Sequence, residues 1–329
     1  MKKEEILTVG APSEDERLAS FTSAQNRVAL LMFLSLGLNV LLSVAAGAAL
    51  SSAALKENVA ARDVANAAVY IIMIGVPVAL SGLICGKKTR SYFTVERGGK
   101  NNAAFAFAAL GAVFFAQLTA VLFEKLGGAV GIDLAGAADT VTEPGHVVFN
   151  AVFTVIFPCV LEELFLRGVV LGELLPYGKG FAVVASGALF ALMHLDPLKM
   201  PVAFISGAVF ALSVIYCQTL TVCIAVHFAN NLITVLFMYM PLFLPEAAYL
   251  AVEAAICAAV FTAGTVAFIY LLRHKNDAAD GGALCTDCNE TYKVDLRRKP
   301  LAKISPYLYV YAAAAIIMTV STLFSGGAK

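Results

Sequence analysis

The stretch that decides the fold is FPCVLEELFLRGVVLG, which runs from residue 157 to residue 172. It has the apolar character of a membrane helix, yet it contains Glu162, Glu163 and Arg167. A charged side chain in the middle of a bilayer costs about 3 kcal/mol or more, so intramembrane charges usually have a partner or a function. A helix that only crosses a membrane has no need of all three. This stretch therefore indicates a polar site inside a helical membrane protein.

The composition of the whole chain also indicates a membrane protein. Of the 329 residues, 60% are hydrophobic and 14% are charged, and the mean hydropathy is +0.82. Soluble domains carry about 25% charged residues and have no need for apolar runs of about 20 residues. The formal net charge is zero. We therefore expect the lipid bilayer, and no nucleic acid, as a partner.

Nine apolar runs approach the length that a membrane-spanning helix needs. They predict an all-α fold, a polytopic membrane helical bundle with about eight or nine transmembrane helices. The runs lie at about 28–50, 64–86, 103–124, 147–174, 180–196, 201–217, 220–243, 247–272 and 305–324. The run at 201–217 is the weakest of these predictions, because it is short and begins at a proline.

The runs and the loops between them predict four parts of the chain. These are a cytoplasmic N-terminal arm (1–27), three N-terminal transmembrane helices (28–126), a core that carries Glu162, Glu163 and Arg167 (147–243), and C-terminal helices (244–329) with a cytoplasmic loop at 273–304. Lys and Arg are concentrated after the second run and in that last loop, whereas the connection after the third run is acidic. Because basic loops remain in the cytoplasm, we expect a multi-pass protein with its N-terminus inside. The compact chain without targeting features favours the cytoplasmic (inner) membrane of a bacterium.

The 273–304 loop contains a single C-x-x-C pair, Cys285 and Cys288. A structural zinc ion needs four ligands, and only His274 is nearby in the sequence. We therefore expect two reduced thiols in a solvated loop.

The charged residues of the opening stretch have a spacing that sorts them by helix face. Glu163 and Arg167 are four residues apart and share a face, which predicts an ion pair. Glu162 points about 100° away from Glu163, so we expect it to face a cavity. The structural alternative is an ion pair that only locks two helices together.

Two later apolar runs repeat the four-residue spacing with other polar residues. FALMH places Phe190 and His194 on one face, and HFANN does the same for His227 and Asn231. A histidine just before Asp196-Pro197 also fits a hydrogen-bonded helix end, because a residue before proline disfavours helix. Polar residues on one helix face also simply join neighbouring helices in lipid.

A buried set of Glu162, His194, His227 and Asn231 suits two related mechanisms. In the first mechanism, Glu162, His194 and His227 are possible ligands of a divalent metal, such as zinc, that activates water. Alternatively, Glu162 and His194 activate water directly, while His227 and Asn231 donate hydrogen bonds to the oxyanion. Both mechanisms end in hydrolysis of a peptide bond.

The three motifs EELFLR (162–167), FALMH (190–194) and HFANN (227–231), in this order on apolar helices, resemble the CAAX-prenyl endopeptidase and bacteriocin-processing (CPBP, or ABI) family of intramembrane proteases. The resemblance covers roughly residues 147–240. It implies an all-helical membrane core and an endopeptidase that cleaves peptides or prenylated protein tails. It also implies that Glu162 and His194 activate water, that His227 and Asn231 stabilise the oxyanion, and that Glu163, Arg167 and Phe190 support them.

The leading hypothesis is therefore an intramembrane endopeptidase of glutamate type or metal-dependent type. Its expected substrate is a membrane-associated peptide or protein, such as a bacteriocin or pheromone precursor or a CAAX-like tail. The alternative is a non-proteolytic membrane scaffold, immunity protein or transporter. A transporter would favour repeat symmetry around discontinuous helices, and the sequence has no evident repeat.

Overall fold

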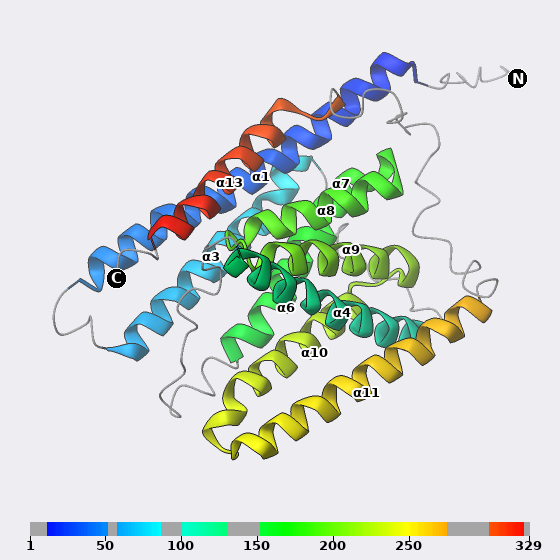
Figure 1. The fold of residues 1–329 in the computed structure, drawn as a ribbon. Coiled ribbons are helices and arrows are strands. Elements are labelled where there is room, and N and C mark those ends of the chain that lie inside the picture. Colours follow the sequence, from blue (N-terminus) through cyan, green and yellow to red (C-terminus); the bar gives the residue numbers. More distant parts are fainter. Residues whose placement is uncertain (1–11, 52–57, 87–100, 130–151, 275–302, 326–329) are drawn as a thin grey trace, which may run out of the picture.

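The computed structural model describes residues 12–51, 58–86, 101–129, 152–274 and 303–325. These residues form helices and no strand, so the predicted all-α bundle is confirmed within them (Figure 1). Among the described residues, six helices are long and apolar enough to cross a membrane. They are α1 (Glu14–Ala49), α3 (Val59–Cys85), α4 (Asn102–Ala129), α9 (Lys199–Cys217), α10 (Leu220–Tyr239, extended by the 3₁₀ turn η6 at Met240–Leu242) and α11 (Glu246–Arg273).

The other three predicted runs also form helices, one of them irregular. Helix α8 (Lys179–Met193) is apolar but short, whereas α13 (Pro306–Ser325) is apolar and has 20 residues. At 1.5 Å per residue, the 15 residues of α8 measure about 22 Å, less than the roughly 30 Å of a hydrocarbon core. The run predicted at 147–174 is divided into consecutive pieces. These are η3 (Val152–Ile156), α6 (Phe157–Glu163), η4 (Leu164–Val170), α7 (Leu171–Leu174) and η5 (Leu175–Tyr177), of which η3 and η4 are π-helical.

Helix α1 begins earlier than the sequence predicted. The first helix was expected near residue 28, after a polar arm, but α1 begins at Glu14. Ser13 and Glu16 form a capping box, in which each side chain accepts a hydrogen bond from the backbone of the other. Phe21 is fully buried, and its ring lies 5.2 Å from that of Tyr177. A search for apolar runs misses this segment, because charged and polar residues are interspersed along 14–27.

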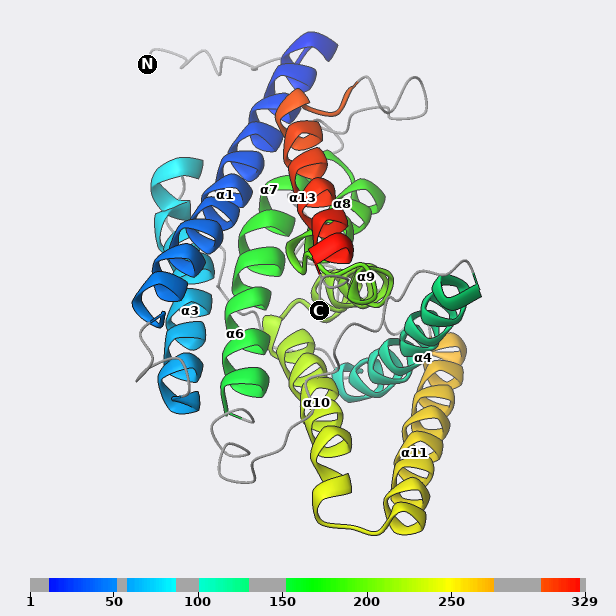
Figure 2. The same cartoon turned by 60° about the vertical axis from the view of Figure 1, so that its left-hand side comes forward.

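Helices α1 and α13, far apart in sequence, lie side by side in both views (Figures 1 and 2). Gln25 of α1 is fully buried and meets the residues just before α13 with both ends of its amide. Its Nε2 donates to the Lys303 carbonyl (3.2 Å), and its Oε1 accepts from the Ser305 N–H (2.9 Å). The start of α13 is thus fixed to α1 by buried hydrogen bonds.

Glycines set the closest contacts between helices. Gly187 of α8 and Gly207 of α9 face each other, and a Cβ built on Gly207 would lie 2.9 Å from the Gly187 Cα. A Cβ on Gly264 of α11 would lie 2.8 Å from the Cα of Gly111 in α4. Such backbone contact is typical of membrane helices that associate through small residues.

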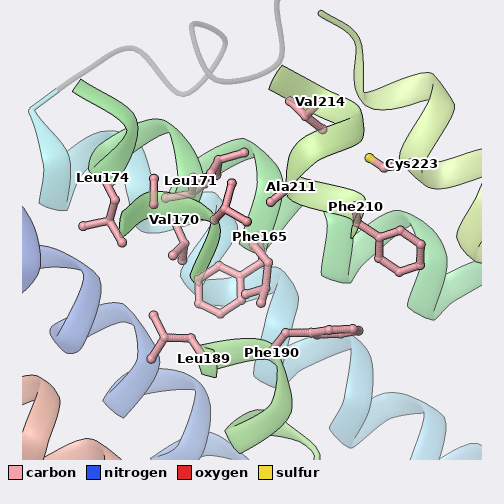
Figure 3. Packing of buried hydrophobic residues seen from close by; sticks show 14 of the residues in the cluster. Phe165, Val170, Leu171, Leu174, Leu189, Phe190, Phe210, Ala211, Val214 and Cys223 are labelled. Carbon is pink, nitrogen blue, oxygen red and sulfur yellow. The ribbon is translucent and has the colours of Figure 1, made fainter. Parts of the chain in front are cut away.

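The core lies where α6 to α10 meet, and α9 runs through the middle of the bundle (Figures 1 and 2). Half of the most apolar 18-residue window of α9 is buried, more than in any other candidate span. The run predicted with most reservation is therefore the central helix. Figure 3 shows Phe165, Leu189, Phe190 and Phe210 among the buried side chains that fill this core.

Candidate active site

The glutamate pair lies at the end of α6, directly before the π-helical segment η4. A π turn holds one residue more than an α turn, and such turns are frequent at functional sites. Glu162 and Glu163 are both buried, with exposed fractions of 6% and 0%. Two adjacent carboxylates are thus held away from solvent by the bundle.

Glu163 and Arg167 form the ion pair that their spacing predicted. Arg167 Nη1 lies 3.0 Å from Glu163 Oε1, and both side chains are fully buried. Arg167 Nη2 also donates to the carbonyl of Gly207 (3.2 Å), which joins η4 to α9. The guanidinium lies over the rings of Phe190 and Phe210, at 4.4 Å and 5.1 Å from their centroids. Cation–π contact adds to the stability of a desolvated arginine.

His227 of α10 is placed between the two carboxylates. Its Nδ1 lies 2.9 Å from Glu163 Oε1, and its Nε2 lies 3.8 Å from Glu162 Oε2. The ring also stacks on Phe210, with centroids 5.1 Å apart. Glu163 therefore orients the imidazole, as a carboxylate partner commonly does, and directs its other nitrogen toward Glu162.

Glu162 is not paired with Arg167, and the cavity that it was expected to face stays a prediction, because its carboxylate contacts other side chains. Its Oε1 accepts a hydrogen bond of 2.5 Å from the hydroxyl of Tyr70 in α3, and its Oε2 is the oxygen that faces His227. Of the two carboxylates, only that of Glu163 contacts the guanidinium of Arg167, whereas both lie beside His227.

His194 follows the last residue of α8 and caps that helix, which ends before Asp196-Pro197 as predicted. Its Nδ1 lies 2.8 Å from the Phe190 carbonyl, and its ring lies 4.7 Å from the Phe190 ring in an edge-to-face arrangement. The next residue, Leu195, has a φ of 51°, in the left-handed region that a leucine seldom adopts. Among the described contacts, none joins His194 to Glu162. The centroid of the Phe190 ring lies 4.7 Å from that of His194 and 6.1 Å from that of His227.

Asn231 lies one turn beyond His227 on α10 and is half-buried. Its Oδ1 accepts a hydrogen bond of 3.2 Å from Asn230 Nδ2. Asn230 Oδ1 in turn lies 3.5 Å from Nε2 of Gln117 in α4. The side-chain amide of Asn231 is thus connected through its neighbour to a second helix.

Sequence reasoning missed Tyr70 and Gln117, which reach the site from α3 and α4. The available signal was weak: each is a polar residue inside an apolar run. Nothing in the chain order indicates which helix such a residue will face.

The predicted metal ligands Glu162, His194 and His227 are not gathered into one cluster. Within the described part of the chain, no group of three or more His, Cys, Asp and Glu side chains has the arrangement that a metal ion requires. Glu162 and His227 are close, but His194 contacts Phe190 instead. This arrangement does not fit a bound metal ion. The C-x-x-C pair at 285 and 288 lies outside the described residues.

The helices and this site define a polytopic membrane protein with a buried glutamate, histidine and arginine cluster. Residues 144–233 match the family model for type II CAAX prenyl endopeptidase Rce1-like proteins. All three sequence motifs lie within this matched segment, so the resemblance predicted from them is confirmed.

A curated relative supports the same family. The membrane-embedded CAAX protease MroQ of Staphylococcus aureus (strain USA300) is 36% identical over 110 residues, which cover 31% of this chain and 43% of that protein. The chain thus matches less than half the length of this relative. No solved structure matches the chain.

Proposed function

We propose that the protein is an intramembrane endopeptidase that hydrolyses a peptide bond of a membrane-associated peptide or protein. The observation that carries this proposal is the placement of His227 between two buried carboxylates, 2.9 Å from Glu163 and 3.8 Å from Glu162. An ion pair with only a structural role requires one carboxylate for each cation, and this cluster contains a second carboxylate. Here Arg167 is paired with Glu163, and Glu162 is kept beside a histidine whose orientation Glu163 fixes.

The proposed reaction uses Glu162 as the general base. Glu162 accepts a proton from a water molecule whose oxygen attacks the peptide carbonyl carbon, and the carbonyl oxygen becomes an oxyanion. His227 in its protonated form donates from Nε2 to that oxyanion, together with the amide of Asn231. The intermediate then collapses, the C–N bond breaks, and the proton on Glu162 passes to the leaving amine.

His194 has a different role in this proposal. When its Nδ1–H donates to the Phe190 carbonyl, the neutral ring carries its lone pair on Nε2. That nitrogen accepts a hydrogen bond from the attacking water and helps to orient it. His194 lies beside Phe190 and not against Glu162, so the water and the substrate bridge the two groups.

We further propose a location and a class of substrate. Basic loops favour the cytoplasmic (inner) membrane with the N-terminus inside. The name of the MroQ relative favours a CAAX-like tail as substrate, and bacteriocin or pheromone precursors are the alternative class of membrane-associated peptide.

The decisive experiment compares detergent-purified wild type with Glu162→Gln and His227→Ala on a library of peptides with and without CAAX-like tails. Removal of a general base typically lowers the rate by 10²-fold or more, so both variants should lose at least about 100-fold in cleavage rate. Glu246→Gln is the matched control, because Glu246 is an exposed glutamate at the start of α11. Each sample is also treated with phenanthroline, and activity that survives the chelator favours the glutamate mechanism over a metal. Cleavage by Glu162→Gln at the wild-type rate refutes the proposal.

A further inference from the structure

Helix α3 lies outside the segment 144–233 that matches the family, yet it contributes a contact to Glu162. The Tyr70 hydroxyl donates to Glu162 Oε1 at 2.5 Å. This distance belongs to the short O–H···O⁻ class, in which a charged acceptor roughly doubles the strength of a hydrogen bond.

The position of Tyr70 in its helix is unusual. From residue 67 to residue 80, the sequence AAVYIIMIGVPVAL contains one polar side chain, and it is Tyr70. A phenol hydroxyl inside an apolar environment needs a hydrogen-bond partner. Within the described residues, the hydroxyl of Tyr70 finds this partner in the carboxylate that the proposed reaction uses as its base.

The contact makes the two oxygens of Glu162 different. Oε1 is held by Tyr70, and Oε2 faces Nε2 of His227 at 3.8 Å. If Tyr70 did not hold Oε1, rotation of the carboxyl group would exchange the two oxygens. Glu163 is held differently, since its Oε1 accepts from both Arg167 and His227.

We infer that Tyr70 is a positioning residue, which fixes the carboxylate of Glu162 so that Oε2 is presented to His227 and the attacking water. This inference rests on the proposed function, since it assigns a support to the same base. It extends the site beyond the matched segment, to a helix that the motifs do not include.

The test is Tyr70→Phe, which removes only the hydroxyl. The expected result is a fall in kcat of about 10- to 100-fold with KM changed by less than about twofold, since misplacement of a catalytic group acts on the chemical step. Tyr177→Phe is the matched control. Tyr177 is also a buried phenol, hydrogen-bonded to Ser20 Oγ at 2.7 Å, but it is remote from the glutamate pair. This control should keep the wild-type kcat.

Infrared difference spectra give a second readout that does not depend on activity. The carboxylate band of Glu162 is assigned by its disappearance in Glu162→Gln. It should shift in Tyr70→Phe and remain unchanged in Tyr177→Phe, because only the first variant removes its donor.

The outcomes separate the two proposals. If Glu162→Gln is inactive while Tyr70→Phe keeps full kcat and an unshifted band, the positioning role is wrong and the endopeptidase proposal stands. If Glu162→Gln is fully active, the proposed function fails. In that case the carboxylate band still decides whether Tyr70 holds Glu162, and an unshifted band overturns this contact as well.

Discussion

Arg167 is the residue whose removal tests the energetics of the buried cluster most directly. Its side chain is fully buried, 3.0 Å from Glu163 and 3.2 Å from the Gly207 carbonyl. Breaking a buried ion pair by removing one partner typically costs 3–5 kcal/mol, because the other charge is left without compensation. Arg167→Met should therefore lower the free energy of unfolding by about 3–5 kcal/mol. Loss of the contacts with Phe190 and Phe210 places the value toward the upper end.

The cause of that loss is separable by a double-mutant cycle. In Glu163→Gln/Arg167→Met, no unpaired carboxylate remains at position 163, so the double variant should be more stable than Arg167→Met alone. SDS titration of the purified proteins in mixed micelles measures all four unfolding free energies. Arg62→Met, at an exposed position near the start of α3, is the matched control and should change stability by less than about 0.5 kcal/mol.

Two results would contradict this reasoning. One is a loss below about 1 kcal/mol in Arg167→Met, which would mean that Glu163 is not left as an uncompensated buried charge. The other is a double variant no more stable than Arg167→Met, which would place the loss in packing and not in charge.

Three further substitutions test other contacts between helices by the same titration. Gly207→Ala adds a Cβ 2.9 Å from the backbone of α8, so it should destabilise by about 1–3 kcal/mol and lower activity, whereas Gly75→Ala, with no atom within 4 Å, should do neither. Gly264→Ala adds a Cβ 2.8 Å from the backbone of α4, and a comparable loss of stability is expected as α4 and α11 separate. Glu173→Gln removes the negative charge that accepts two hydrogen bonds from Arg27, at 2.7 and 2.9 Å. It should lower the free energy of unfolding by about 2 kcal/mol. A Gly207→Ala protein as stable as wild type would argue against the close crossing.

The parts of the site that lie within one helix were predictable from the sequence. Residues four apart share a helix face, which gave the ion pair of Glu163 and Arg167 and the shared face of Phe190 and His194. Charged residues and histidines within apolar runs indicated a buried polar site from the sequence alone.

The parts that depend on contacts between helices were not predictable in the same way. Tyr70 is 92 residues from Glu162, and nothing in the local pattern of α3 indicates that partner. The grouping of His194 with Glu162 followed from the motifs, but the end of α8 places His194 against Phe190. Where one helix crosses another depends on backbone contacts such as Gly207 with Gly187. A periodic pattern describes one helix at a time and does not contain this information.

The hydrogen bonds between Gln25 and the start of α13 have a consequence for how the chain is made. The two partners, Gln25 and Ser305, are separated by 280 residues. At a synthesis rate of about 5–20 residues per second, roughly 15–60 s pass between their emergence from the ribosome. Throughout that interval the amide of Gln25 lacks its partners at Lys303 and Ser305, and every residue of the catalytic cluster is made before they appear. The contact between α13 and α1 thus forms only after the catalytic cluster has been synthesised, so a chain interrupted before residue 303 would leave a buried amide of α1 unsatisfied.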